Sequence, residues 1–188
     1  MHTAYIGMGA NLPSIAGPPE STLAAADMRL ASLGHVVARS SLYSTQPVGF
    51  ADQPRFINAA VALETDLTPQ ALLSGLLAIE LEFGRDRTAS FTNGPRTLDL
   101  DILLFGDRKI TQPGLEIPHP RLAQRAFVVI PLSEIAPHAL DPVTGKTVTQ
   151  LLQGLFPNSE GINDEVVQIQ ADGWRAGAGP DCAGPGLS

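Results

Sequence analysis

The chain has 188 residues, a formal net charge of −7, 44% hydrophobic residues and 16% charged residues. These values are typical of a folded globular protein, and the length fits one domain with a substantial core. The negative charge argues against broad binding to DNA or RNA, which needs a basic surface, although a few arginines could still hold a nucleotide.

The sequence also limits where the protein works. Its one cysteine, Cys182, excludes an intrachain disulfide and a zinc site built from cysteines. The first residues lack the basic and apolar regions of a signal peptide, and no apolar run is long enough to span a membrane. We therefore expect a cytoplasmic monomer that acts on small molecules, without nucleic-acid or membrane partners.

The hydrophobic pattern predicts alternating strands and helices over the first 105 residues. Strands are expected at 3–9, 36–44, 56–64 and 95–105, and helices at 20–33 and 68–84. Thr68 and Pro69 suit the start of the second helix, and Gly84 suits its end. The resulting order βαββαβ predicts an α/β (α+β) fold, a ferredoxin-like sheet with helices on one face.

The remaining chain reads as C-terminal additions to this sheet. Residues 106–118 suggest a β-hairpin or loop, 126–135 a buried helix or strand, and 147–155 a short amphipathic helix. Pro131 argues against a regular helix in the second of these segments. Because glycine and proline dominate from 172 onward, we expect a single domain over 1–171 and a disordered tail over 172–188.

The stretch that points most directly to chemistry is Pro95–Phe105. Leu98, Leu100 and Ile102 share one face of a strand, whereas Asp99 and Asp101 share the other, about 6.6–6.8 Å apart along the chain. An ordinary solvated strand face is the alternative interpretation. However, aspartate is disfavoured in strands, and two like charges side by side need a cation or donors to offset them. The pattern therefore predicts a site for a divalent cation.

Arginines before and after this strand suggest that the cation is bound together with phosphate. Arg85 and Arg87 lie in a polar loop before the strand, Arg96 lies at its entrance, and Arg125 follows it. Guanidinium groups suit phosphate oxygens, and Mg²⁺ binds through a few carboxylates together with phosphates and waters. Arg85 could instead complement the dipole of the preceding helix, and Arg87 could be an ordinary solvated loop charge. The sequence contains neither a P-loop nor the protein-kinase motifs.

Several motifs together resemble the 6-hydroxymethyl-7,8-dihydropterin pyrophosphokinases, abbreviated HPPK. They are Ala4–Leu12, Tyr43–Gly49, Gln53–Ala59, Asn93–Leu103, Ile117–Arg121 and Arg125–Val128, and they follow one another in the family's order over roughly residues 3–157. The resemblance implies Mg²⁺-dependent transfer of pyrophosphate from ATP to the hydroxymethyl group of a reduced pterin, giving AMP, in folate biosynthesis.

The resemblance also implies roles for individual residues. Asp99 and Asp101 would hold two Mg²⁺ ions, and Arg85 and Arg96 would join them as catalytic residues that assist transfer. ATP contacts are implied for Glu80, Arg87, Arg96, Ile102, His119 and Arg125. Pterin contacts are implied for Thr45, Val48, Phe56, Asn58 and Phe127, with the two phenylalanines enclosing the flat ring.

Some positions depart from the family pattern, and two other functions remain open. Asn93 stands where some relatives carry Trp, and Leu77 stands where some carry a polar residue, which affects the expected ATP affinity. A metal-dependent phosphohydrolase could use the same aspartates with water as nucleophile. A non-catalytic ferredoxin-like binding module would not need both aspartates together with Arg85 and Arg96.

Overall fold

A computed structural model describes residues 1–49, 51–87, 94–156 and 166–178. Its strands are β1 (His2–Ala10), β2 (His35–Arg39), β3 (Leu42–Thr45), β4 (Phe56–Thr65), β5 (Asp99–Phe105), β6 (Ile110–Gln112), β7 (Leu115–Ile117), β8 (Val166–Ile169) and β9 (Gly177–Ala178). Its helices are α1 (Pro19–Leu30), α2 (Pro69–Glu82), α3 (Ala126–Ile135) and α4 (Val148–Leu155), with a 3₁₀ turn η1 (Leu122–Gln124).

An antiparallel sheet forms the centre of the molecule. Its strands follow the order β5-β1-β4-β2-β9, and β3 pairs with the first half of β4 and with β8. The strand predicted over 36–44 is divided because Ser40 interrupts it: its backbone N–H donates to the Ala60 carbonyl, and its hydroxyl accepts from the Ala60 N–H. The βαββαβ core and its ferredoxin-like order confirm the predicted fold class.

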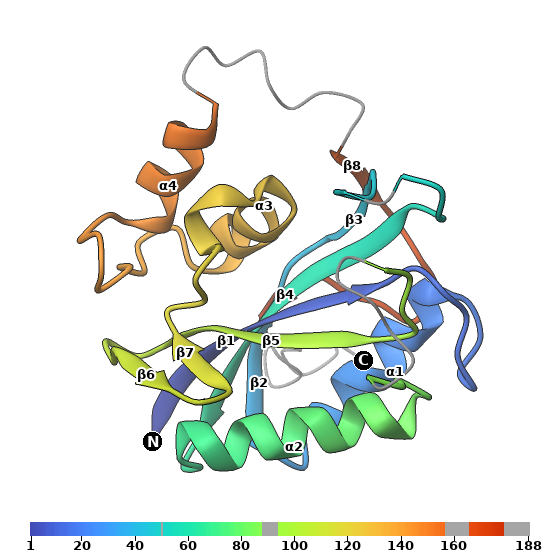
Figure 1. Cartoon of the computed structure of the whole chain (residues 1–188), viewed down its shortest axis with the longest axis horizontal. Coiled ribbons are helices and arrows are strands. Elements are labelled where there is room, and N and C mark those ends of the chain that lie inside the picture. Colours follow the sequence, from blue (N-terminus) through green and yellow to red (C-terminus); the bar gives the residue numbers. More distant parts are fainter. Residues whose placement is uncertain (50, 88–93, 157–165, 179–188) are drawn as a thin grey trace, which may run out of the picture.

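Helices cover both faces of this sheet, as Figure 1 shows. Helices α1 and α2 lie against one face, where Ile6, Met8 and Leu100 join the main core. Helices α3 and α4 lie on the other face, where Leu103 and Val129 belong to a second core. The predicted placement of helices on one face therefore describes the ferredoxin-like unit, and the C-terminal additions cover part of the opposite face.

Helix α2 brings part of the site into position. Thr68 caps its start, because the hydroxyl accepts a hydrogen bond from the Ala71 N–H, and Pro69 occupies the first turn. Leu72 and Leu76 are fully buried on its inner face. Gly84 follows the helix with a φ of +80°, a left-handed conformation that suits glycine, and turns the chain toward the sheet.

The elements after β5 agree in part with their predictions. Strands β6 and β7 form the expected hairpin. Segment 126–135 is a helix despite Pro131, since burial of Val129 and Leu132 outweighs the one backbone hydrogen bond that proline cannot donate. Helix α4 begins at a capping box in which Thr147 and Gln150 each satisfy the other's backbone N–H.

Residues 166–178 return to the sheet. Strand β8 pairs with β3, and β9 pairs with β2 at Ala38 and Arg39. Trp174 packs against the main core and donates from its indole Nε1 to the Ser40 carbonyl over 2.8 Å. These contacts involve residues 172–178 of the segment expected to be a disordered tail, and residues 179–188 of that segment lie outside the described residues.

Within the described ranges, every helix is too short or too polar to cross a bilayer.

Candidate active site

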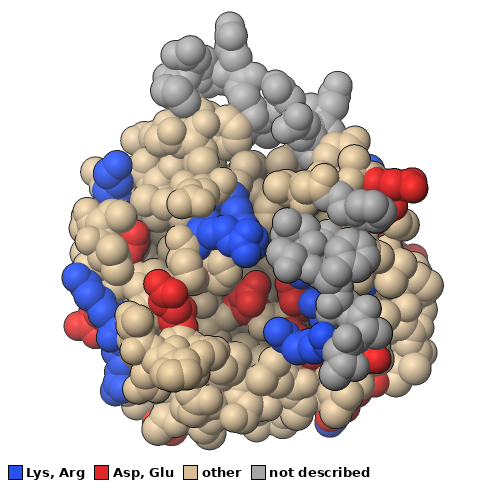
Figure 2. Space-filling view, viewed as in Figure 1, with Lys and Arg blue, Asp and Glu red and all other residues tan. Residues whose placement is uncertain are grey.

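The two aspartates lie on one face of β5, opposite glycines of the neighbouring strand. Asp99 pairs with Gly9 of β1, and Asp101 pairs with Gly7. Paired residues of antiparallel strands point to the same face, so β1 presents no side chain beside either carboxylate. This gap forms the floor of a cavity on the face that carries α3. Acidic and basic side chains gather around a hollow near the centre of this side of the molecule (Figure 2).

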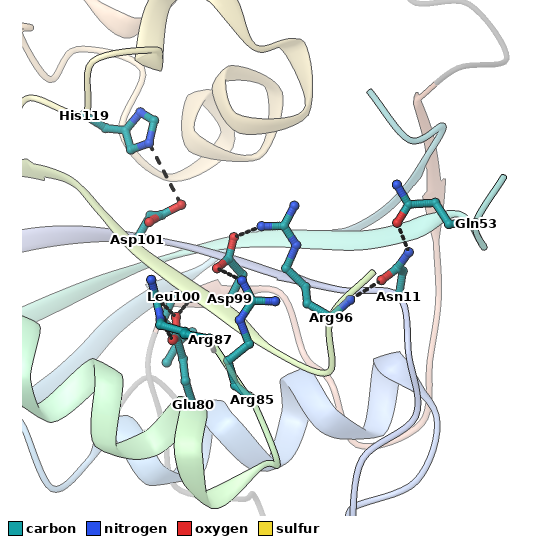
Figure 3. Close-up of polar contacts among 10 residues, drawn as sticks. All are labelled: Asn11, Gln53, Glu80, Arg85, Arg87, Arg96, Asp99, Leu100, Asp101 and His119. Carbon is teal, nitrogen blue, oxygen red and sulfur yellow. Dashed lines mark hydrogen bonds and ion pairs between the residues drawn. The ribbon is translucent and has the colours of Figure 1, made fainter. Parts of the chain in front are cut away.

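Asp99 is bound by two of the predicted arginines (Figure 3). Arg96 Nη1 lies 2.7 Å from Asp99 Oδ2, and Arg85 Nη2 lies 3.5 Å from Asp99 Oδ1. Burial lowers the pKa of Arg85, because a guanidinium loses hydration there, and the charge of Asp99 opposes this effect. One carboxylate thus holds two cations that would otherwise repel each other.

Asp101 has fewer cationic partners than Asp99. Burial raises its pKa to about 6, and the negative charge of Asp99 adds to the effect. His119 Nε2 lies 4.0 Å from Asp101 Oδ2. The Nδ1 atom of His119 accepts from the Arg121 N–H, so the neutral ring carries its proton on Nε2, facing Asp101. Burial and the charges of Arg125 and Arg121 lower the pKa of His119, which favours that neutral form.

Glu80 lies beneath the acidic strand and is only 1% exposed. Its carboxylate accepts from the Leu100 N–H, between the two aspartates, and from the guanidinium of Arg87 at 2.6 and 2.9 Å. Burial raises the pKa of Glu80, and the Leu100 and Arg87 hydrogen bonds oppose the shift. These hydrogen bonds hold Arg87 and β5 in place, and the expected ATP contact of Glu80 stays a prediction.

The cavity on the glycine floor, here called the sheet cavity, is lined by all five residues expected to bind the pterin. It is lined by Thr45, Val48, Phe56, Asn58, Phe127, Arg96, Arg125, Asp99 and Asp101, among others. Asn58 is fixed by a 2.8 Å hydrogen bond from its Nδ2 to Thr45 Oγ1. The guanidinium of Arg96 lies 5.2 Å from the centre of the Phe56 ring, and that of Arg125 lies 5.5 Å from the Phe127 ring.

A second cavity, here called the hairpin cavity, lies between β5 and the β6–β7 hairpin. Leu73, Ile102 and Leu115 supply apolar lining, and His119 and Asp101 supply polar groups. Asp101 lines both cavities. Two ligands could therefore lie on either side of this carboxylate and meet beside it.

The site retains donors that no described residue uses. Arg85 Nε, Arg96 Nε and Thr97 Oγ1 are buried and have no hydrogen-bond partner within the described ranges. Buried donors of this kind are costly unless a ligand satisfies them, and an anion such as a phosphate would do so.

The two carboxylates also fit Mg²⁺. In the described part of the chain, no group of three or more His, Cys, Asp or Glu side chains is arranged to hold a metal ion. Two aspartates suit an ion that takes its other ligands from water and substrate phosphates, as Mg²⁺ does.

Comparison with known proteins identifies the family. The family model of 7,8-dihydro-6-hydroxymethylpterin-pyrophosphokinase (HPPK) matches residues 5–137, which include most of β1, all of β2 to β7, α3 and all the predicted site residues. The chain belongs to the HPPK family.

Named relatives from bacteria agree with this assignment. The chain is 47% identical over 150 residues to the 2-amino-4-hydroxy-6-hydroxymethyldihydropteridine pyrophosphokinase of Pseudomonas aeruginosa, covering 79% of this chain and 88% of the relative. It is 44% identical over 154 residues to the enzyme of the same name from Synechocystis sp., covering 81% of this chain and 75% of the relative.

Solved structures support the HPPK fold. Wild-type Plasmodium falciparum HPPK-DHPS with SDX-DHP superposes with a TM-score of 0.67 at 15% identity, covering 91% of this chain. This chain spans 48% of that protein's length. At this identity the likeness concerns the fold alone.

The structure brings together most residues that the resemblance singled out, but in two cavities rather than one. The expected ATP contacts are divided: Ile102 and His119 line the hairpin cavity, and Arg96 and Arg125 line the sheet cavity. Glu80 and Arg87 face each other beneath β5. Sequence reasoning assigned no role to Gly7, Gly9 or Asn11, although a repeated glycine opposite two aspartates is a usable signal once the strand register is known.

Proposed function

We propose that this protein transfers pyrophosphate from ATP to the hydroxymethyl group of 6-hydroxymethyl-7,8-dihydropterin, forming AMP and the pterin diphosphate. The observation that carries the proposal is the meeting of two cavities at Asp101, in a chain that belongs to the HPPK family. One cavity would hold the acceptor, the other would hold the nucleotide, and the acidic strand would lie between them.

The sheet cavity would hold the pterin. Phe56 and Phe127 offer aromatic faces for a flat heterocycle, and Asn58 offers an amide to its polar edge. Thr45 orients that amide, and exposed Val48 contributes an apolar edge. In this pose the hydroxymethyl group would point toward Asp99 and Asp101.

The hairpin cavity would hold the base and sugar of ATP. Leu73, Ile102 and Leu115 suit an apolar ring, and His119 lies toward Asp101, where the phosphates would begin. The triphosphate would then extend along β5 to the unused donors of Arg85 and Arg96 and to Arg125. Arg87, 52% exposed and held by Glu80, would approach from the other side of β5.

The reaction needs positioning and charge stabilisation more than it needs a nucleophilic side chain. The acceptor hydroxyl oxygen attacks the β-phosphorus and its proton passes to solvent, while the bond to the α,β-bridging oxygen breaks and AMP leaves with that oxygen. Arg85, Arg96 and Arg125 would stabilise negative charge on the transferred group. Mg²⁺ bound by Asp99 and Asp101, for which we propose two ions, would neutralise and orient phosphate oxygens.

We further propose that the protein acts as a monomer, because residues of one chain line both cavities.

The test is a product analysis. Purified protein is incubated with ATP, Mg²⁺ and 6-hydroxymethyl-7,8-dihydropterin, with matched samples lacking pterin or containing EDTA. The expected result is AMP formed in equal amount to the pterin diphosphate, only in the complete mixture. Release of ADP or inorganic phosphate without pterin would instead indicate the metal-dependent hydrolase, which family membership does not support.

A further inference from the structure

Asn11 joins two parts of the active site, although it lines neither cavity. It follows β1 directly and is 2% exposed. Its Oδ1 accepts from the Arg96 N–H over 2.8 Å, and its Nδ2 donates to Gln53 Oε1 over 3.0 Å (Figure 3). The Nδ2 also donates to the Pro54 carbonyl over 3.0 Å. Every polar atom of this amide is therefore used.

The backbone partners fix the orientation of the amide. The Arg96 N–H can only donate, so the Asn11 atom facing it must be the oxygen. The Pro54 carbonyl can only accept, so the other atom must be the nitrogen. The Asn11 and Leu12 N–H groups also donate to the Arg96 carbonyl, at 3.0 and 3.1 Å, so the backbone of Arg96 is held on both sides.

The two sides of the amide lead to different substrates. Arg96 carries its guanidinium to Asp99 and over the Phe56 ring, where the transferred phosphate would lie. Gln53 and Pro54 lie near the end of the loop that follows Thr45, and only Arg55 separates them from Phe56, the first residue of β4. Asn11 is thus the shared partner of the phosphate arginine and of the loop that would border the pterin.

We propose that Asn11 is a positioning residue that sets the loop ending at Gln53–Pro54 in register with Arg96, so that pterin binding and phosphate stabilisation occur in one geometry. The inference rests on the proposed function. It predicts that the two sides of the amide can be separated by substitution, because one atom serves the arginine and the other serves the loop.

Asn11→Asp separates the side of the amide that serves Arg96 from the side that serves the loop. A carboxylate oxygen still accepts from the Arg96 N–H, but the second oxygen has no proton to donate and faces the Pro54 carbonyl. Rotation of the Gln53 amide could restore one hydrogen bond but not the one to Pro54. We expect the Kd for pterin to rise about tenfold or more, while the Kd for a non-hydrolysable ATP analogue stays within about twofold.

Asn11→Ala removes both sides. It is expected to raise the pterin Kd similarly and also to lower kcat by a further factor of about ten, because the Arg96 backbone loses its side-chain acceptor. Gln70→Glu makes the same amide-to-acid change at an exposed site on α2. It is the control for Asn11→Asp and should leave the Kd for pterin and the Kd for the ATP analogue unchanged. Thermal unfolding of each variant establishes that it is folded, and Gln53→Leu replaces Asn11→Asp if that variant unfolds.

The outcomes distinguish the two proposals. Wild-type protein that neither binds pterin nor forms AMP overturns the proposed function. Active wild-type protein with an Asn11→Asp variant that binds pterin normally overturns the positioning role alone. Equal loss of pterin and ATP-analogue binding in Asn11→Asp also overturns it, because general damage to the site would have that effect.

Discussion

At the scale of single residues, the two aspartates that look alike in the sequence have different surroundings. Asp99 lies between the guanidinium groups of Arg85 and Arg96. Asp101 has a raised pKa of about 6 and faces both cavities. Asp99 therefore holds the arginines in place in the free protein, whereas the charge of Asp101 is poorly compensated until a cation arrives.

Asp101→Asn is expected to lower kcat/KM for AMP formation by about three orders of magnitude, since a ligand for Mg²⁺ is lost. In EDTA at pH 8, the same variant should unfold at a temperature equal to or above that of the wild type. A raised folded-state pKa means that ionised Asp101 costs stability above pH 6, so the variant's advantage should shrink as the pH falls toward 4.

Asp99→Asn provides the contrast for this measurement. Removing its charge leaves Arg85 and Arg96 without their shared anion, so we expect a lower unfolding temperature at pH 8 in the absence of phosphate. The interpretation would be wrong if Asp101→Asn destabilised the free protein as much as Asp99→Asn does.

At the scale of elements, the pairing of β1 with β5 creates the space for substrates. A Cβ placed on Gly9 would lie 3.1 Å from Asn58 Oδ1, the amide proposed to contact the pterin. β1 therefore needs a residue without a side chain at this position, because a side chain would displace the Asn58 amide proposed to bind the pterin as well as crowd the sheet.

Gly9→Ala is expected to weaken pterin binding about tenfold, because Asn58 must move, and to change the free energy of unfolding by less than about 1 kcal/mol. Isothermal calorimetry with pterin and urea unfolding measure the two effects. Gly154→Ala in α4, where an added Cβ meets nothing within 4 Å, is the control and should leave pterin binding unaltered. Equal pterin affinity in both variants would contradict the role of the glycine floor.

Many of the strands and helices could be predicted from the sequence, because their positions depend on local periodicity and capping. The period of two in β5 put Asp99 and Asp101 on one face, and Thr68 marked the start of α2. The opposition of Gly7 and Gly9 to the acids could not be predicted, because register depends on how β1 and β5 pair across nearly 90 residues of chain. The enclosed position of Glu80 was missed for a different reason, since a helical glutamate is ordinarily solvated.

At the scale of the whole molecule, residues 166–178 pair with β2 and β3, and β3 precedes the loop that ends at Gln53–Pro54. Strand β8 pairs with β3, and the Trp174 indole donates to the Ser40 carbonyl, between β2 and β3. Sequence reasoning missed these strands because they are short and depend on partners more than 100 residues away, and because β9 lies in a glycine-rich stretch.

Trp174→Ala is expected to lower the free energy of unfolding by about 2 kcal/mol, because the indole covers part of the main core. Trp174→Phe keeps most of that contact and loses only the hydrogen bond to the Ser40 carbonyl, so about 1 kcal/mol is expected. Urea unfolding of both variants measures the difference. A chain ending at residue 171 that unfolded at the wild-type urea concentration would show that this segment adds nothing to stability.

The hydrogen bonds on the outer edge of β5 bear on how the protein behaves at high concentration. This strand lies at an edge of the sheet, where free backbone groups could pair with a strand from another molecule and begin aggregation. On that edge the Leu100 N–H donates to Glu80, and the Leu103 carbonyl accepts from the His119 N–H over 3.0 Å. Both groups are therefore already bonded within the molecule. Glu80 and the backbone of His119 thus occupy two hydrogen-bonding groups on this edge, so variants at Glu80 made to study ATP should be checked for solubility first.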